Sequence, residues 1–535
     1  MILKYRIILF VSLFGLFANL HAEISLIPYP KYISELGDKV IVPQNLRLSY
    51  DEAFKDELEY LEGILIEEHN FKLEHDDSSC VDLKLVKNRT CKPDGYTLSV
   101  SSSEIILQAS DNGGMLYAVQ TLRQLLEKDS EDALEVPIVE IIDYPEFEWR
   151  AFMLDEARNF QGIDVVKNLL DEMSILKMNV FHWHLTDDQG WRIEIKEYPL
   201  LTEIGGRRDS TQLYWYDSNI YDTIPSEGYY TQEQIKDIVE YAKKRNIMIV
   251  PEIDMPGHMS AAIAAYPWLG TNKDSITVPC SYGVKHNVLD VSSPLVIGFV
   301  NDVIDELMEL FPGSVFHIGG DEVRPDHWST SSNIKEYMKS NRIESFAALH
   351  LDFIKRVSSS VSSRDRRMMG WNDITGDKLH HFQHSVELND DVKLPGNTII
   401  QFWLGDNSLI QKAAQSGYDI VNAFNEYTYL NYNHDKITPG KEYGFAPIPL
   451  EKAYDFLPIP DDFPEDLKEK IIGLSCQMWG EWTPTVLDIN NMVFPYIAAH
   501  AETGWTKPCQ KSFDRFLTSL GYFNKRWLSK GYVIE

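Results

Sequence analysis

The chain has 535 residues and a mass of 61.6 kDa, more than one small domain of roughly 100–200 residues needs. Its 44% hydrophobic and 12% aromatic content supplies a large packed core and excludes disordered and fibrous classes. Lys and Arg number 50 against 81 Asp and Glu, so the net charge is −31. Such a chain repels phosphate backbones and anionic membrane surfaces, and we therefore expect no nucleic-acid partner.

The first 22 residues have the layout of a secretory signal. Lys4 and Arg6 precede an apolar run over residues 7–20, and Ala22 stands before Glu23. This order of basic, apolar and small residues predicts cleavage after Ala22. The mature chain would then have a charge of −33 and no membrane span. We expect an exported protein, either periplasmic or secreted, or lysosomal in a eukaryote.

Five cysteines are too few for a disulfide scaffold in a chain of this length. Cys80 and Cys91 flank a short polar stretch and could pair in an oxidising compartment, although spacing alone does not decide the connectivity. Asn88 begins a glycosylation sequon, which matters only in a eukaryote.

Residues 23–145 are predicted to form a small α+β accessory domain. Segments 95–100 and 104–109 have the alternation of paired strands. Residues 115–126 carry an apolar stripe at helical spacing. The sequence Asp143-Tyr144-Pro145 breaks the pattern and marks the boundary.

Residues 146–508 are predicted to form a (β/α)8 TIM barrel, and residues 509–535 a helical extension. Eight short apolar runs recur with helical segments between them, and residues 163–176 repeat apolar side chains at three- and four-residue steps. Eight βα units indicate a barrel, whose chemistry lies at the carboxyl ends of its strands. The runs are 150–154, 179–185, 247–253, 315–320, 366–371, 398–403, 419–424 and 471–479.

The fourth run ends in two glycines followed by Asp321 and Glu322. An acid pair in a cleft suits general acid catalysis. Neighbouring residues of a regular strand point to opposite faces, so both carboxylates can serve one site only where the strand ends and twists.

The second run contains His182 and His184, which point the same way on a strand. A metal-dependent barrel hydrolase would use such a pair, with His258, His317 and Asp321 as further ligands. Hydrogen-bonded core histidines have the same pattern, and spacing alone leaves the two interpretations open.

The third run, 247–253, leads into a turn that presents His258. Several later runs end in aromatic side chains. Tryptophans at one end of a barrel offer flat apolar walls for the CH-rich faces of sugars. Glu481 and Arg158 would supply directional hydrogen bonds to sugar hydroxyls. The tryptophans concerned are Trp371, Trp403 and Trp479.

From about Tyr96 onward the chain resembles the β-N-acetylhexosaminidases of glycoside hydrolase family 20. The resemblance rests on motifs in one order: WRAFMLDEARNF, KMNVFHWHLTDDQGWR, PEIDMPGHMSA, FHIGGDEV, GWND, QFW, YTYLNY and MWGEW. The amino-terminal helix GGMLYAVQTLRQLL is similar to that of the family's accessory domain. The resemblance implies a barrel enzyme that needs no metal and no cofactor, and under it His182 and His184 become orienting core residues.

The resemblance also implies a role for each matched residue. Glu322 is the general acid, and Asp321 holds the substrate's 2-acetamido group, which replaces an enzyme nucleophile. Tyr429 donates to the acetamido carbonyl. Asn431 stands where the family often has Asp, which bears on charged or 6-substituted sugars. The other implied substrate contacts are Arg158, Trp371, Trp403, Trp479 and Glu481, with Asp187 and His258 as a supporting relay.

The implied activity is exo-acting, retaining hydrolysis of terminal β-linked N-acetylglucosamine or N-acetylgalactosamine. Its substrates would be oligosaccharides or glycoconjugates, and a homodimer is possible. Two alternatives are kept: the metal-dependent hydrolase built on His182 and His184, and a non-catalytic sugar-binding barrel.

Overall fold

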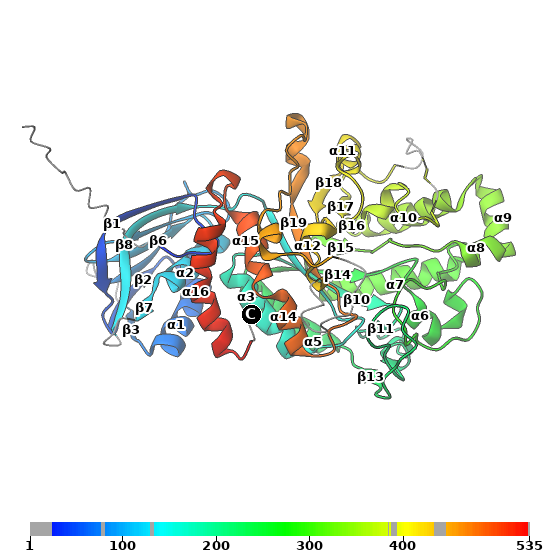
Figure 1. Ribbon diagram of the computed structural model, residues 1–535, viewed down its shortest axis with the longest axis horizontal. Coiled ribbons are helices and arrows are strands. Elements are labelled where there is room, and N and C mark those ends of the chain that lie inside the picture. Colours follow the sequence, from blue (N-terminus) through cyan, green and yellow to red (C-terminus); the bar gives the residue numbers. More distant parts are fainter. Residues whose placement is uncertain are drawn as a thin grey trace, which may run out of the picture.

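The computed structural model describes residues 24–75, 81–128, 133–383, 385–386, 393–432 and 446–532. Figure 1 shows an amino-terminal sheet with its helices at the left and a barrel at the right. The predicted signal at residues 1–22 and Cys80 lie outside the described residues, so signal cleavage and the Cys80–Cys91 pair stay predictions. No helix in the described part of the chain is long and apolar enough to cross a membrane.

The amino-terminal unit is a mixed sheet in the order β1-β8-β5-β6-β4-β2-β3, with β7 paired to β8. Strands β5 and β6 alternate buried and partly exposed side chains, as expected of a sheet with one packed face. The predicted helix is confirmed as α2. It begins at Asn112, before the apolar stripe, because the Asp111 side chain accepts from the Gly114 amide at 2.8 Å and caps it. The elements are β1 (Tyr32–Ile41), β2 (Asn45–Tyr50), η1 (Glu52–Phe54), α1 (Lys55–His69), β3 (Lys72–His75), β4 (Leu83–Lys87), β5 (Tyr96–Val100), β6 (Ile105–Ala109), α2 (Asn112–Leu125), β7 (Glu127–Lys128) and β8 (Leu134–Asp143).

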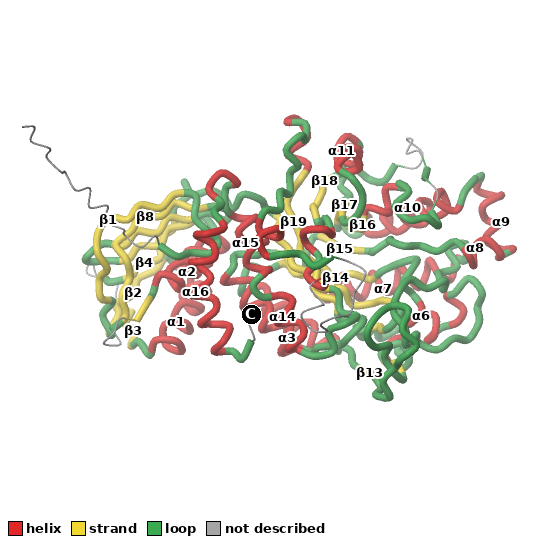
Figure 2. The backbone as a smooth tube through the Cα atoms, viewed as in Figure 1, coloured by secondary structure: helices red, strands yellow, loops and turns green. Residues whose placement is uncertain are grey.

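Eight parallel strands form the barrel, as predicted. Each pairs with the next along the chain, and β19 pairs back with β9 to close the ring. Figure 2 shows these strands with helices on both sides. The strands are β9 (Trp149–Asp155), β10 (Val180–Asp187), β14 (Met248–Ile253), β15 (Val315–His317), β16 (Arg367–Trp371), β17 (Ile399–Phe402), β18 (Asp419–Asn422) and β19 (Ile471–Met478). A two-residue strand, β11 (Gly190–Trp191), pairs antiparallel with β10.

Helices connect the barrel strands, with one departure from the regular βα alternation. The described residues between β16 and β17 contain only the 3-10 turn η3 (Asn372–Thr375). The side-chain amide of Asn372 donates to the Leu404 carbonyl at 2.9 Å. This hydrogen bond ties the connection to the chain just after β17. The main helices are α3 (Ile163–Ile175), α5 (Gln232–Lys243), α6 (Ser260–Ala265), α7 (Pro294–Leu310), α9 (Ser332–Asn341), α10 (Phe346–Ser362), α11 (Asn407–Gln415), α13 (Leu450–Tyr454), α14 (Val486–Val493) and α15 (Tyr496–Trp505).

The amino-terminal unit and the barrel share a buried polar contact. Lys177, two residues after α3, has its Nζ 3.0 Å from Asp143 Oδ2, and the Trp505 indole donates to the same oxygen at 2.9 Å. The carboxy-terminal helix α16 (Phe513–Ser529) lies between the two units in Figure 1. Its Arg526 pairs with the buried carboxylate of Glu172 on α3 at 3.0 Å. These contacts hold the barrel against the sheet.

Candidate active site

A pocket of about 130 Å³ opens at the carboxyl ends of the barrel strands. It contains all the predicted catalytic and substrate-binding residues together with His258, and two tyrosines that the sequence reasoning missed. Because the residues come from the ends of all eight barrel strands and the loops after them, only the closed barrel brings them together. The lining residues are Arg158, Tyr216, His258, Asp321, Glu322, Trp371, Trp403, Tyr429, Asn431, Tyr432, Trp479 and Glu481.

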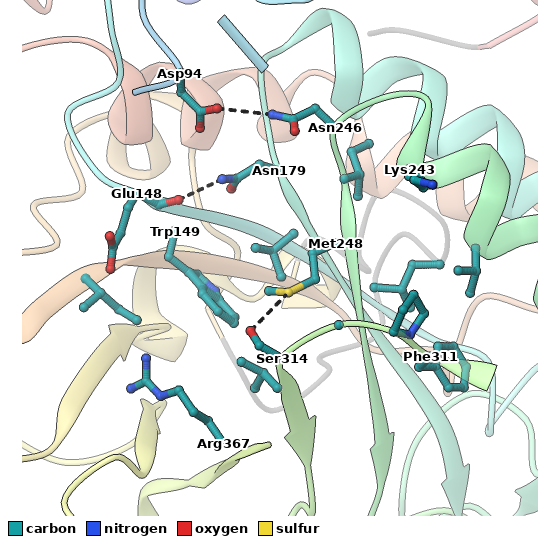
Figure 3. Close-up of a pocket in the computed structure, with 18 residues that line it drawn as sticks. Asp94, Glu148, Trp149, Asn179, Lys243, Asn246, Met248, Phe311, Ser314 and Arg367 are labelled. Carbon is teal, nitrogen blue, oxygen red and sulfur yellow. Dashed lines mark hydrogen bonds between the residues drawn. The ribbon is translucent and has the colours of Figure 1, made fainter. Parts of the chain in front are cut away.

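A larger pocket, of about 520 Å³, lies at the opposite end of the barrel. Figure 3 shows Trp149, Met248 and Arg367 around it, each the first residue of its strand, with Asp94 and Asn246 at the rim. Conserved chemistry in barrel enzymes lies at the carboxyl ends of strands, whereas the amino ends serve stability. The smaller pocket is therefore the candidate active site.

The turn after β15 places both carboxylates at the pocket. Gly319 has φ +64° and Gly320 has φ +90°, so the chain turns sharply where β15 has ended. A Cβ at Gly319 would lie 1.8 Å from Asp254 Oδ1, which itself accepts from the Gly320 amide at 3.0 Å. The turn thus meets the condition stated above: the strand ends, and Asp321 and Glu322 both reach one pocket.

Asp373 supports the acid side of the pocket and was not predicted. Its Oδ1 accepts from the Glu322 backbone amide at 3.2 Å, and its Oδ2 accepts from the Trp403 indole at 3.0 Å. His380 Nε2 lies 3.3 Å from Asp373 Oδ1, and His380 Nδ1 lies 3.9 Å from Glu322 Oε1. Asp373 stands two residues after Trp371 in the GWND motif, so the motif could have indicated it. His380 lies in a loop that contains no motif.

His258 links the two carboxylates to a buried acid behind them. Its Nε2 lies 3.7 Å from both Asp321 Oδ2 and Glu322 Oε2, and its Nδ1 lies 3.2 Å from Asp187 Oδ1. Burial disfavours the charged imidazole, but Asp187 and Asp254 raise the pKa of His258 well above its usual value. The neighbouring carboxylates thus favour the protonated form of His258.

Burial dominates the protonation of the two candidate catalytic acids. It raises the pKa of Asp321 to about 7 and raises the pKa of Glu322, while the imidazolium of His258 lowers both. A raised pKa lets Glu322 keep its proton closer to neutral pH, which is what a general acid needs. For Asp321, the positive charge of His258 is what favours the carboxylate.

Arg158 and Glu481 form a second polar wall. Arg158 is held by Asp187 Oδ2 at 2.8 Å and by Asp155 Oδ2 at 3.1 Å, and it lies over the Trp479 ring, 5.1 Å from the centroid. Tyr216, which the sequence did not predict, donates a hydrogen bond from its hydroxyl to Glu481 Oε1 at 3.0 Å. Tyr216 lies in the connection between β11 and α5, where no motif marks it.

Aromatic rings form the remaining walls. Trp403 and Tyr429 are stacked, with centroids 6.1 Å apart and an interplanar angle of 9°. Trp479 lies 6.1 Å from Tyr429 and 5.7 Å from Trp371. Such flat faces pack against the CH groups of a sugar ring.

Several polar atoms of the pocket are buried without a hydrogen-bond partner among the described residues. They are His258 Nε2, Asp321 Oδ1, Asn431 Oδ1 and Glu481 Oε2. A buried polar group without a hydrogen-bond partner lowers the stability of the folded protein. Such groups in a pocket can gain their hydrogen bonds from a polar ligand. A ligand with several hydroxyl or amide groups would satisfy them.

His182 and His184 lie beneath the pocket and do not line it. Both surround one carboxylate: His184 Nδ1 and His182 Nε2 lie 2.6 and 2.8 Å from Glu252 Oε2, and the Trp371 indole donates to Glu252 Oε1 at 2.8 Å. Ligand atoms of His182, Glu252 and His317 are close enough to share a metal ion. The contacts with Glu252 also fit the other predicted interpretation, in which the histidines orient the pocket wall.

A (β/α)8 barrel with two acids, an imidazolium and a ring of tryptophans at the carboxyl ends of its strands has the site of a glycoside hydrolase. Comparison with known proteins agrees. The model of the glycosyl hydrolase family 20 catalytic domain matches residues 147–508, and that of domain 2 of the family matches residues 23–144. The chain therefore belongs to glycosyl hydrolase family 20, as the motif resemblance implies.

Two relatives and a solved structure are similar over most of this chain. A β-hexosaminidase of Porphyromonas gingivalis is 36% identical over 440 residues, which are 80% of this chain but only 53% of that relative. A β-hexosaminidase of Vibrio furnissii is 32% identical over 490 residues, 90% of this chain and 77% of the relative. The structure of a Vibrio harveyi exo-β-N-acetylglucosaminidase in complex with N-acetylglucosamine has a TM-score of 0.82 at 30% identity, covering 96% of this chain and 78% of that one.

Proposed function

We propose that the chain is an exo-acting, retaining β-N-acetylhexosaminidase. It would release terminal β-linked N-acetylglucosamine or N-acetylgalactosamine from oligosaccharides and glycoconjugates. The observation that carries this proposal is the adjacent pair Asp321 and Glu322 in one pocket of about 130 Å³. The β-hexosaminidases among the relatives, and the N-acetylglucosamine bound in the Vibrio harveyi structure, support it.

The pocket suits one amino sugar. The rings of Trp371, Trp403 and Trp479 would cover the apolar faces of the sugar and its acetamido methyl group. Arg158 and the free oxygen of Glu481 would bind its hydroxyls, together with Asn431. This division into apolar faces and a polar edge is typical of sugar recognition.

Glu322 would act as the general acid. Burial raises its pKa and so favours the protonated form, which would donate to the glycosidic oxygen as the bond to the anomeric carbon breaks. After the leaving group departs, the Glu322 carboxylate would take a proton from the incoming water.

Asp321 would hold the substrate's 2-acetamido group rather than attack the sugar. The acetamido carbonyl oxygen attacks the anomeric carbon and forms an oxazolinium ring, while the Asp321 carboxylate stabilises the positive charge at the amide nitrogen. Tyr429 would donate its hydroxyl to the acetamido oxygen. Water then opens the ring from the face that the leaving group left, which retains the configuration.

Substitution of the proposed acid tests this function. Glu322→Gln should lower kcat/KM by roughly 10²–10⁴ for substrates with poor leaving groups, the range expected of general acid catalysis. The loss of kcat/KM should be smaller for a nitrophenyl glycoside, because its nitrophenolate leaving group departs without protonation. Glu336→Gln, an exposed change on α9, is the matched control and should leave both rates unchanged. A fully active Glu322→Gln protein would refute the assignment.

The same assay separates the alternatives. Hydrolysis that survives prolonged chelation argues against a metal-dependent enzyme, and any hydrolysis lost in Glu322→Gln argues against a non-catalytic sugar-binding protein.

We also propose that residues 1–22 direct export. Recovery of the mature chain, beginning at Glu23, from the periplasm or medium would support that proposal.

A further inference from the structure

A second pocket adjoins the candidate active site. It has a volume of about 440 Å³, and Glu481 lines both pockets. Its walls combine apolar side chains, among them Leu213, Ile224 and Trp482, with polar ones such as Gln212. A mixture of flat apolar and hydrogen-bonding groups suits a sugar ring better than it suits a purely apolar ligand.

Tyr216 stands at the boundary between the two pockets. It lines the smaller one, its hydroxyl donates to Glu481 Oε1 at 3.0 Å, and its ring meets Trp482 edge-on with centroids 5.5 Å apart. Glu481 and Trp482 are both walls of the larger pocket. The Gln212 side chain donates to the Tyr216 carbonyl at 3.0 Å and holds the backbone of the loop in place.

Tyr216 reaches the protein surface as well as the candidate active site. The residue is 38% exposed although its hydroxyl is engaged inside the pocket. Its partner Glu481 has one oxygen occupied by this hydroxyl and the other buried without a partner among the described residues. Under the proposed function, a sugar hydroxyl binds that second oxygen. Any group attached to that hydroxyl would have to pass the Tyr216 ring.

We propose that Tyr216 is a specificity-determining residue that confines the active site to a single sugar, by closing it against the adjoining pocket at the Glu481 wall. This inference rests on the proposed function. The pocket behind Tyr216 is large enough to hold a second sugar, linked to the first through the hydroxyl that faces Glu481. Tyr216 thus has two separable roles: its hydroxyl positions Glu481, and its ring blocks extension of the substrate.

Two substitutions separate these roles. Tyr216→Phe removes the hydroxyl and keeps the ring, whereas Tyr216→Ala removes both. The substrates are p-nitrophenyl β-N-acetylglucosaminide and two p-nitrophenyl disaccharides, in which a plain hexose is linked to O3 or O4 of the 2-acetamido sugar. A plain outer hexose lacks the acetamido group, so the enzyme cannot trim it first. Tyr221→Ala, on the same loop and lining neither pocket, is the control.

The wild type should hydrolyse the monosaccharide glycoside and release no disaccharide. Tyr216→Phe should lower kcat/KM on the monosaccharide about tenfold, because a hydrogen bond to a charged group is lost, with no disaccharide released. Tyr216→Ala should release intact disaccharide from at least one substrate, at least tenfold above the wild-type background. Tyr221→Ala should match the wild type.

Release of disaccharide by the wild type, or none by a folded Tyr216→Ala protein that still cleaves the monosaccharide, would overturn the inference. A Tyr216→Ala protein that has lost all hydrolysis is decided by binding: the free disaccharides should raise its unfolding midpoint and not that of Tyr216→Phe, and no rise would overturn the inference. A wild type that cleaves no 2-acetamido glycoside would contradict the proposed function instead.

Discussion

At the scale of single residues, the imidazole ring of His258 lies between three acids. His258 lies 3.7 Å from the carboxyl oxygens of Asp321 and Glu322 and 3.2 Å from that of Asp187. Burial pushes the pKa values of Asp321 and Glu322 upward, and the positive charge of His258 pulls both downward. The charge of His258 therefore shifts the pH at which each of the two carboxyl groups ionises.

Replacement of this charge gives a signed pH prediction. His258→Asn removes the cation that lowers both pKa values, so the pKa of Glu322 and that of Asp321 should rise. The acid limb of the kcat/KM profile reports ionisation of Asp321 and the basic limb reports loss of the Glu322 proton, so both limbs should move to higher pH. His286→Asn, an exposed change, should leave the profile unchanged. A shift of either limb to lower pH would contradict this account.

Residue types and motif order were enough to predict most of the pocket lining, because the strand ends of a barrel converge on one mouth. Asp373 stands in a motif and could have been predicted, whereas His380 and Tyr216 escaped prediction for a physical reason. They act through Glu322 and Glu481, which are far away in the sequence, and only the folded loops bring them within 3–4 Å. Periodicity carries no information about such loop contacts.

At the scale of elements, the end of β15 decides whether two neighbouring acids share a site. The glycines after it adopt positive φ, and the space beside Gly319 is taken by Asp254. The apolar runs predicted this strand and the other seven, since parallel barrel strands are apolar on both faces. They did not predict the connection from β16 to β17. The described residues there form one 3-10 turn and no α-helix.

A methyl group at the turn should disrupt catalysis. Gly319→Ala would place a Cβ 1.8 Å from Asp254 Oδ1 at φ +64°, so the turn must shift. A displacement of about 1 Å in a catalytic group costs on the order of 10²-fold in rate, and we expect kcat to fall by that amount. Gly417→Ala has the same kind of backbone strain, with φ +92° and no neighbour within 4 Å. It should lower stability alone; equal effects of the two changes on kcat would contradict the steric argument.

At the scale of the whole molecule, the amino-terminal sheet serves as a support for the barrel. Lys177 and Trp505 of the barrel domain both contact Asp143 at the end of β8, and all three are buried. The Trp505 side chain packs in the hydrophobic core of the sheet. A sequence boundary at Pro145 does not reveal this contact, because its partners are separated by 34 and 362 residues.

Removal of one partner tests the support. Lys177→Met leaves the buried Asp143 carboxylate without its cation, which should cost about 3–5 kcal/mol and lower the unfolding midpoint. Turnover below that temperature should be unchanged, since Lys177 does not line the pocket. Lys39→Met breaks the exposed Lys39–Glu127 pair and should cost less than about 1 kcal/mol. Equal loss in both variants would show that the interface pair has no special role.

In the proposed mechanism, the substrate's own acetamido group is the nucleophile and Asp321 holds it. The most direct measurement is a panel of p-nitrophenyl β-glycosides that differ only at C2 and C4. Both 2-acetamido compounds, with gluco and galacto configuration, should be hydrolysed, whereas the glucoside and galactoside with a 2-hydroxyl group should not. Comparable hydrolysis of the 2-hydroxyl glycosides would contradict the account, because those sugars have no group that could form the oxazolinium ring.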